Sequence, residues 1–97
     1  MNSDRFPGSG VQPPEVMEFP CRYEIKAIGR GAIRFEALVQ GIVTRFIGPG
    51  DLLLVQSRAS RGGKYLSVTC VIRAQSREQV YAIYAELGRR PEVIFSV

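Results

Sequence analysis

The stretch that decides the fold runs from Lys64 to Leu87 and reads KYLSVTCVIRAQSREQVYAIYAEL. In its first half apolar residues alternate with more polar ones, and this period of two predicts a strand with one apolar face. The apolar positions are Leu66, Val68, Cys70 and Ile72. In its second half the apolar spacing becomes three and four, which predicts one buried stripe on a helix. The stripe consists of Val80, Ile83, Tyr84 and Leu87.

The boundaries of this helix carry their own signals. Ser76 is followed three residues later by Gln79, a capping-box pattern typical of a helix N-terminus. Gly88 follows the last apolar position, where we expect a left-handed C-terminal cap. The sequence therefore predicts a strand that passes directly into a capped helix.

The part of the chain before this stretch predicts a strand, a helix and a second strand. Tyr23, Ile25 and Ala27 alternate through a strand over 21–28, and residues 29–31 are expected to form a turn. The helix is predicted over 33–46, with its apolar stripe formed by Phe35, Leu38, Val39, Ile42 and Phe46. Gly41 inside that helix costs about 1 kcal/mol relative to alanine, so we expect it to allow the close approach of a neighbour.

The remaining segments complete the pattern. Gly48-Pro49-Gly50 is expected to end the first helix, and a strand is predicted over 52–59. Residues 60–63 then form a hairpin connection in which glycines supply positive φ angles. A last short strand is predicted over 93–97. Residues 1–18 lack a periodic apolar pattern and are predicted to form a flexible tail ahead of a domain over 19–97.

The order strand, helix, strand, strand, helix, strand indicates an α+β fold of the ferredoxin-like βαββαβ type. Two right-handed crossovers place both helices on one face of a four-stranded antiparallel sheet and leave the other face open. The open face is expected to carry Glu24, Lys26 and Ile28 from the first strand. From the strand after the hairpin it is expected to carry Tyr65, Ser67, Thr69, Val71 and Arg73.

Composition limits the classes of function. The 97 residues suit one domain, and 13 Lys and Arg against 9 Asp and Glu give a formal charge of +4, too modest and too interleaved to indicate nucleic acid. The chain has no histidine, which removes the usual catalytic triads and most zinc sites. Cys21 and Cys70 fit no metal spacing and are expected to be reduced thiols of a cytoplasmic protein. No apolar run reaches the roughly 20 residues of a membrane span.

One set of segments resembles a known family. The segments are Phe19-Pro20, Lys26 to Gly29, Gly63-Lys64-Tyr65-x-Ser67-Val68-Thr69 and Glu78-Gln79-Val80-x-x-Ile83-Tyr84-x-x-Leu87. They resemble the YbeD-like family of small bacterial proteins, whose name suggests a role in lipoate regulation. The resemblance implies a ferredoxin-like domain similar to the ACT domains, which bind amino acids and regulate metabolic enzymes. It implies no catalytic residues.

The first candidate site lies before the first helix. Gly29, Arg30 and Gly31 correspond to the loop that helps ACT domains to hold an effector between two chains. Glycine backbone N–H groups at a helix N-terminus favour a small carboxylate, to which Arg30 or Arg34 adds charge. The loop lacks the acidic residue and the Pro-Gly pair typical of ACT domains, and the alternative interpretation is a tight turn with solvated arginines.

The second candidate site is the basic hairpin with Arg58, Arg61, Lys64 and the adjoining Tyr65. One interpretation is a surface that docks an acidic partner or a phosphate. The alternative is an edge hairpin whose charges discourage edge-to-edge strand pairing. The open face offers one aromatic residue on its central strands and no RNA-recognition motif, so we expect no nucleic acid there and favour a homodimer through that face.

Enzymatic chemistry is not expected. The acidic residues Glu36, Asp51, Glu78 and Glu86 are scattered singly, and no activated serine, phosphate loop, metal site or cofactor site is recognisable. Two hypotheses follow for a non-enzymatic module of bacterial metabolism. One is an ACT-type sensor of a carboxylate metabolite, linked to lipoate or amino acids and acting on a metabolic enzyme. The other is a protein-docking adaptor that uses the basic hairpin and the open face without a small ligand.

Overall fold

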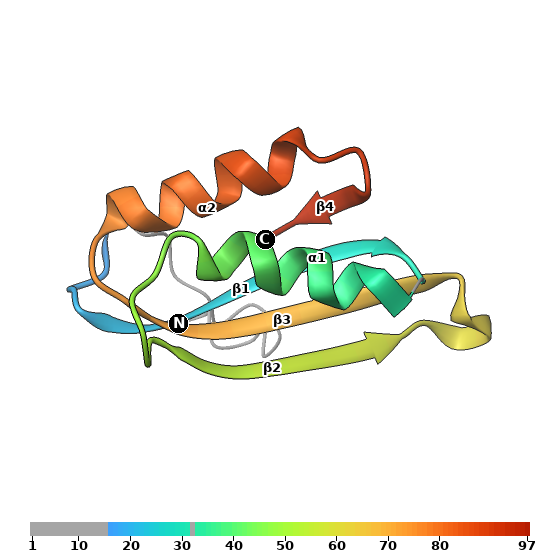
Figure 1. Ribbon diagram of the computed structural model, residues 1–97, viewed down its shortest axis with the longest axis horizontal. Helices are drawn as coiled ribbons and strands as arrows, with labels where there is room; N and C mark the ends of the chain where they lie inside the picture. Colours follow the sequence, from blue (N-terminus) through green and yellow to red (C-terminus); the bar gives the residue numbers. More distant parts are fainter. Residues whose placement is uncertain (1–15, 32) are drawn as a thin grey trace, which may run out of the picture.

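A computed structural model describes residues 16–31 and 33–97 (Figure 1). Its elements are β1 Cys21–Arg30, α1 Ile33–Thr44, β2 Leu52–Ala59, a short 3-10 turn Arg61–Gly63, β3 Tyr65–Ala74, α2 Arg77–Arg89 and β4 Val93–Ser96. The predicted tail over 1–18 falls mostly outside the described residues. Met17, near the end of that tail, is partly buried and packs against the core.

The predicted α+β topology is confirmed. The four strands form one antiparallel sheet in the order β2-β3-β1-β4, and both helices lie over the same face of it (Figure 1). The central pair, β1 and β3, is in register without interruption from Cys21 opposite Ala74 to Arg30 opposite Tyr65. In the described part of the chain, no helix has the length and apolar character needed to cross a membrane.

The core lies between the central strands and the two helices. Apolar residues at alternate positions of β1 and β3 meet apolar stripes of α1 and α2, which is the arrangement that the two periodicities predicted. The buried core residues are Tyr23, Ile25, Ala27, Phe35, Val39, Ile42, Val43, Val68, Cys70, Ile72, Ala74, Val80, Ile83 and Leu87.

The start of α2 is fixed by two polar side chains. Ser76 is the N-cap, and its Oγ accepts a hydrogen bond from the Gln79 N–H at 3.1 Å, as predicted. The Gln79 Oε1 accepts from the Gln75 N–H at 2.8 Å, one residue earlier than the usual capping box. The Gln79 Nε2 donates to the Phe46 carbonyl at 2.9 Å, so the same side chain joins the start of α2 to the segment that follows α1.

Several local predictions were wrong. Gly29 and Arg30 belong to β1 and not to a turn, and α1 ends at Thr44, whose Oγ1 donates to the Gln40 carbonyl at 2.9 Å. Gly88 lies inside α2, which continues to Arg89 and has no left-handed cap.

The close glycine contact is at Gly29 and not at Gly41. A Cβ on Gly29 would collide with the Phe35 ring of α1 and lie 2.6 Å from the Glu92 carbonyl oxygen. Gly41 is exposed, and a Cβ there would meet no atom within 4 Å. The glycine in β1 therefore lets the first helix and the loop before β4 approach the sheet, whereas the glycine in α1 has no packing role.

Replacing these two glycines with alanine is expected to have opposite effects. Gly29→Ala should lower the free energy of unfolding by about 1–3 kcal/mol, because the methyl group overpacks a closed contact. Gly41→Ala, the matched control, should raise it by about 0.5–1 kcal/mol, because alanine loses less backbone entropy in a helix. Urea unfolding followed by circular dichroism measures both values. Equal effects of the two substitutions would contradict this account of Gly29.

Candidate docking surface

The turn between β2 and β3 is held by a small set of hydrogen bonds. Gly62 and Gly63 adopt φ angles of 83° and 77°, as the glycine pattern predicted. The Ser60 N–H donates to the Tyr65 carbonyl at 2.8 Å, and the Tyr65 N–H donates to the Ser60 Oγ at 3.0 Å. These two hydrogen bonds join β2 to β3 just before the turn. They therefore fix the backbone positions of the neighbouring basic residues.

A hollow at this hairpin brings together three of the four predicted docking residues. Arg58, Arg61 and Tyr65 line it, and Lys64 extends its Nζ over the Tyr65 ring at 5.4 Å from the ring centre. We call this site the hairpin hollow. Its other lining residues are Ile28, Ala59, Ser60 and Ser67. The site thus combines cationic groups with a small apolar floor, and no carboxylate is among the described residues that line it.

The hairpin hollow continues into a polar trough on the open face. The two share Arg58 and Ser67, and the trough is lined by Glu24, Lys26, Gln56, Ser57, Arg58, Ser67 and Thr69. Among the described residues, Lys26, Arg58 and Arg61 take part in no ion pair. Their charges therefore face solvent without an internal counterion.

One open-face residue departs from its prediction. Val71 is only 2% exposed, although it alternates with the core-facing residues of β3. Leu54, directly opposite it on β2, is 42% exposed, and Phe95 on β4 is 55% exposed. The open face is thus part apolar at its edges and polar in its middle. The homodimer expected through it stays a prediction.

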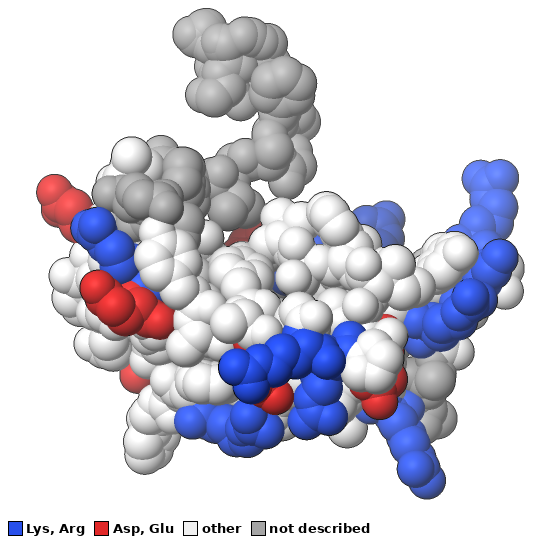
Figure 2. All heavy atoms as spheres, turned by 90° about the horizontal axis from the view of Figure 1, so that it is seen from above, with Lys and Arg blue, Asp and Glu red and all other residues white. Residues whose placement is uncertain are grey.

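The excess of basic over acidic residues is larger in strands β1, β2 and β3 and their hairpin than in the helical segments. Seven Lys and Arg and two Asp and Glu lie in residues 21–30 and 51–74, namely Arg22, Lys26, Arg30, Arg58, Arg61, Lys64 and Arg73 against Glu24 and Asp51. Five bases and four acids lie in residues 33–46 and 77–92. Figure 2 shows basic side chains projecting from the end of the molecule that carries the β2–β3 hairpin. The interleaving of charges along the sequence therefore conceals an uneven distribution in space.

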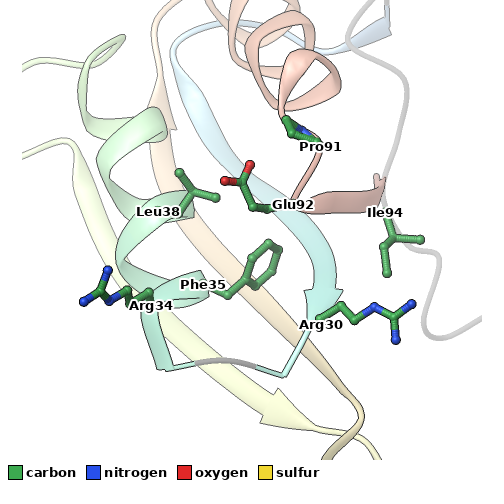
Figure 3. Close-up of a pocket in the computed structure, with 7 residues that line it drawn as sticks. All are labelled: Arg30, Arg34, Phe35, Leu38, Pro91, Glu92 and Ile94. Atoms are coloured by element: carbon green, nitrogen blue, oxygen red, sulfur yellow. The ribbon is translucent and has the colours of Figure 1, made fainter.

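The predicted carboxylate site is only partly assembled. Arg30 and Arg34 line a groove of about 520 Å³ between α1 and the β4 segment, together with Phe35, Leu38, Pro91, Glu92 and Ile94. Figure 3 shows the two guanidinium groups directed away from each other, on opposite sides of the groove. The groove is mostly apolar, with the two arginines at its rim and the Glu92 side chain between its walls (Figure 3).

The backbone of the two predicted ligand glycines is already engaged. The Gly31 N–H donates to the Lys64 carbonyl at 2.8 Å, which extends the β1–β3 ladder by one pair. Gly29 lies opposite Leu66 two residues earlier, and alternate pairs of an antiparallel ladder exchange hydrogen bonds. A Cβ on Gly31 would also collide with the Gly63 carbonyl oxygen. Both glycines thus serve close packing of backbone, so an anion at this loop would depend on the arginine side chains.

Two of the acidic residues, Asp51 and Glu86, are paired with arginine side chains. Glu86 is surrounded by Arg45, Arg89 and Arg90, with N–O distances of 3.5, 3.6 and 3.6 Å. Asp51 lies 3.8 Å from the Arg73 guanidinium. Within residues 16–31 and 33–97, no three His, Cys, Asp or Glu side chains lie close enough together to hold a metal ion.

Among the described residues, three titratable groups away from these surfaces have raised pKa values. Burial raises the pKa of the Cys70 thiol to about 11, and the Glu36 carboxylate adds to the effect. Burial also raises the pKa of Cys21. Both cysteines are free thiols. The Tyr84 hydroxyl has a raised pKa, first because it is buried and then because it lies beside the Tyr23 hydroxyl.

The family follows from comparison with known proteins. The sequence over residues 14–97 matches the family described as "Protein of unknown function (DUF493)". The chain belongs to this family. It is 37% identical over 78 residues to a UPF0250 protein of Nitrosomonas europaea, a match that covers 80% of this chain and 90% of the relative. It is 44% identical over 80 residues to a UPF0250 protein of Ectopseudomonas mendocina, with 81% and 86% covered.

A solved structure supports the fold alone. The structure of an uncharacterized protein from Thermotoga maritima superposes with a TM-score of 0.58 at 17% identity, covering 78% of this chain and 92% of that one. The YbeD-like resemblance predicted from the sequence is confirmed, because DUF493 and UPF0250 are names of that family. These relatives are named as uncharacterised proteins.

The groove between α1 and β4 was missed by sequence reasoning apart from its two arginines. Phe35 and Leu38 read as ordinary members of an apolar stripe, and Pro91, Glu92 and Ile94 lie in a different part of the chain. Nothing local signals that these segments share a hollow. The hairpin hollow was easier to predict, since most of its residues lie within a few positions of one turn.

The two thiols are expected to differ in reactivity. At about pH 8 an ordinary thiol, with a pKa of about 8.5, reacts readily, whereas roughly one Cys70 thiol in a thousand is ionised at a pKa of about 11. Ellman's reagent on the folded protein should modify Cys21 first and Cys70 only on unfolding. The Cys21→Ser variant isolates Cys70, and rapid modification of that variant would contradict the burial of Cys70.

Proposed function

We propose that this protein is a non-enzymatic docking module that binds an acidic segment of a partner protein at the hairpin hollow and the adjoining trough. The observation that carries the proposal is the cluster of Arg58, Arg61 and Lys64 around Tyr65, in which neither arginine forms an ion pair with a described residue. Complementary charge accelerates encounter and selects partners. The apolar floor of Ile28 and Tyr65 adds area for an aliphatic or aromatic side chain of the partner.

Two features favour a protein partner over nucleic acid. Glu24 lines the end of the trough that lies farthest from the hairpin, where it would repel a phosphate backbone. The central strands present Ser67 and Thr69 where a base-stacking surface needs aromatic rings. An acidic polypeptide tolerates both, because its carboxylates are spaced along a chain that also carries neutral residues.

The only two lysines of the chain, Lys26 and Lys64, both lie on this side of the molecule and make the proposal testable. Carbodiimide coupling joins a lysine amine directly to a carboxylate. In an extract of the native cell, it should link partner Asp or Glu residues to peptides containing Lys26 or Lys64. Charge reversal of Arg58 and Arg61 to Glu should reduce the linked product by about tenfold or more, because the steering charge is lost.

The controls separate docking from general stickiness. The Arg77→Glu/Arg89→Glu variant makes the same change of net charge on the helical side and should link as the native protein does. Lys26→Arg/Lys64→Arg keeps the charge and removes the amines, so the partner should still co-purify without a covalent link. Equal loss from both double Glu variants, or recovery of RNA in place of protein, would overturn the proposal.

A second candidate function is a sensor of a carboxylate metabolite that regulates a metabolic enzyme, in the manner of ACT domains. The observation that favours it is the apolar groove with Arg30 and Arg34 at its rim. Such a groove suits a ligand with an aliphatic body and a terminal carboxylate, and lipoate and branched amino acids are of that kind.

A titration decides between the two functions. If the sensor function holds, lipoate or a branched amino acid should shift the amide resonances of residues 30–38 and 91–94 in a two-dimensional NMR spectrum. Arg34→Ala should weaken the effect, since it removes one of the two cations. Leu53→Ala, on the far edge strand, is the control and should leave it unchanged. A spectrum that does not respond to any of these carboxylates contradicts the sensor function.

A further inference from the structure

The two edges of the sheet differ in length and accessibility. β4 has four residues, whereas β2 has eight and, within residues 16–31 and 33–97, is paired only on its β3 side. Leu52 and Val55 pack against the core, but Gln56, Ser57, Arg58 and Ala59 are all exposed, whichever face their side chains take. Figure 1 shows this half of β2 running out toward the hairpin end of the molecule. The second half of β2 is thus a sheet edge without helical cover.

The ladder determines which backbone groups of this edge are unpaired. The Ser60 N–H donates to Tyr65, so this is a hydrogen-bonded pair. Hydrogen-bonded pairs alternate with non-hydrogen-bonded ones, and Arg58 opposite Ser67 and Gln56 opposite Thr69 therefore also exchange bonds. The N–H and C=O groups of Val55, Ser57 and Ala59 point away from β3. They form a row of donors and acceptors that a further strand would complete.

The first half of β2 does not offer the same row. The register shifts between Leu52 and Leu54, and an irregularity of this kind twists an edge away from further pairing. The usable edge is therefore about five residues long, from Val55 to Ala59, which matches the length of a short recognition segment.

The charges of this edge select its occupant. Arg58 projects from it toward the hairpin hollow, and Arg61 follows in the turn. A second copy pairing through the same edge would bring the two sets of arginines together, and like charges on neighbouring strands destabilise pairing. A segment whose acidic side chains lie on the same face as Arg58 is instead stabilised by attraction between opposite charges. On its other face, Val55 and Ala59 favour small apolar residues.

We propose that the acidic partner binds by adding a strand to β2 along Val55–Ala59, using a segment in which acidic and apolar residues alternate. The inference rests on the proposed docking function and specifies its mode: main-chain hydrogen bonds to Val55, Ser57 and Ala59, and carboxylates over Arg58 and Arg61. An extended segment places every second side chain on one face, so alternation is what this edge requires.

Synthetic peptides test the mode directly. A seven-residue peptide of alternating Glu and Val should bind about tenfold or more tightly than a peptide of the same composition with its Glu residues in one block, because only the first directs all its carboxylates to one face. Isothermal titration calorimetry measures both affinities. Equal affinity of the two peptides would overturn strand addition.

Backbone methylation isolates the main-chain hydrogen bonds. Two versions of the alternating peptide carry N-methyl groups on the odd or on the even residues. Strand addition requires that one version loses about tenfold or more in affinity and the other retains it, because the N–H groups of a strand point alternately toward and away from its neighbour. Binding by charge alone would leave the two versions alike and would overturn the inference.

A variant of the protein gives the reciprocal test. Ser57→Pro removes a donor that points away from β3 and leaves the β2–β3 ladder intact, so the fold should persist and the peptide affinity should fall. Ser57→Ala controls for the side chain, and thermal unfolding of both variants checks the fold. Arg58→Glu separates the two proposals. Suppose that Arg58→Glu abolishes peptide binding, whereas neither N-methylation of the peptide nor Ser57→Pro lowers the affinity. The docking function then stands and strand addition falls. If Arg58→Glu also has no effect, the docking function falls as well.

Discussion

The uninterrupted pairing of β1 with β3 is the constraint on which the rest of the structure depends. Ten consecutive residues of each strand face one another, from Cys21 and Ala74 at one end to Arg30 and Tyr65 at the other. A slip by one residue would turn every buried side chain to the opposite face. The fixed register therefore decides which face of the sheet receives the helices and which face stays open. It also carries the hairpin, because β3 pairs with β2 on its other side.

The fold could be predicted from the sequence because periodicity is a local signal that tertiary packing reinforces. The change from alternation to helical spacing around Ser76 lies within one short stretch, and its cap forms as the residue types require. The glycines were less predictable, because their role depends on atoms brought in from elsewhere. Gly41 was predicted to make a close contact and Gly88 to cap a helix, yet a Cβ at either position would meet open space. Gly29 was predicted to lie in a turn, but it lies in β1 against the Phe35 ring.

The candidate sites also divide into one that a local sequence signal predicts and one that depends on distant segments. Arg58, Arg61, Lys64 and Tyr65 were predicted together because one turn connects them, and the structure gathers them around one hollow. The carboxylate site was inferred from a loop whose backbone groups the ladder uses instead, and only its arginines remain as candidates. Residues such as Ile94 and Glu92 enter that groove through the crossover to β4, which no local pattern describes. The uneven placement of charge likewise emerges only when alternate elements separate into two layers.

The bond from Gln79 to Phe46 has a further consequence for how the domain holds together. The side-chain amide of Gln79 makes two hydrogen bonds to the backbone. Its oxygen accepts from the Gln75 N–H, and its nitrogen donates to the Phe46 carbonyl. The α1–β2 connection and the β3–α2 junction are therefore joined at one point, although they belong to different crossover units. Opening of either junction would leave a polar group of the other without its partner, so the two halves of this pseudo-repeated fold are expected to lose their order in a single cooperative step.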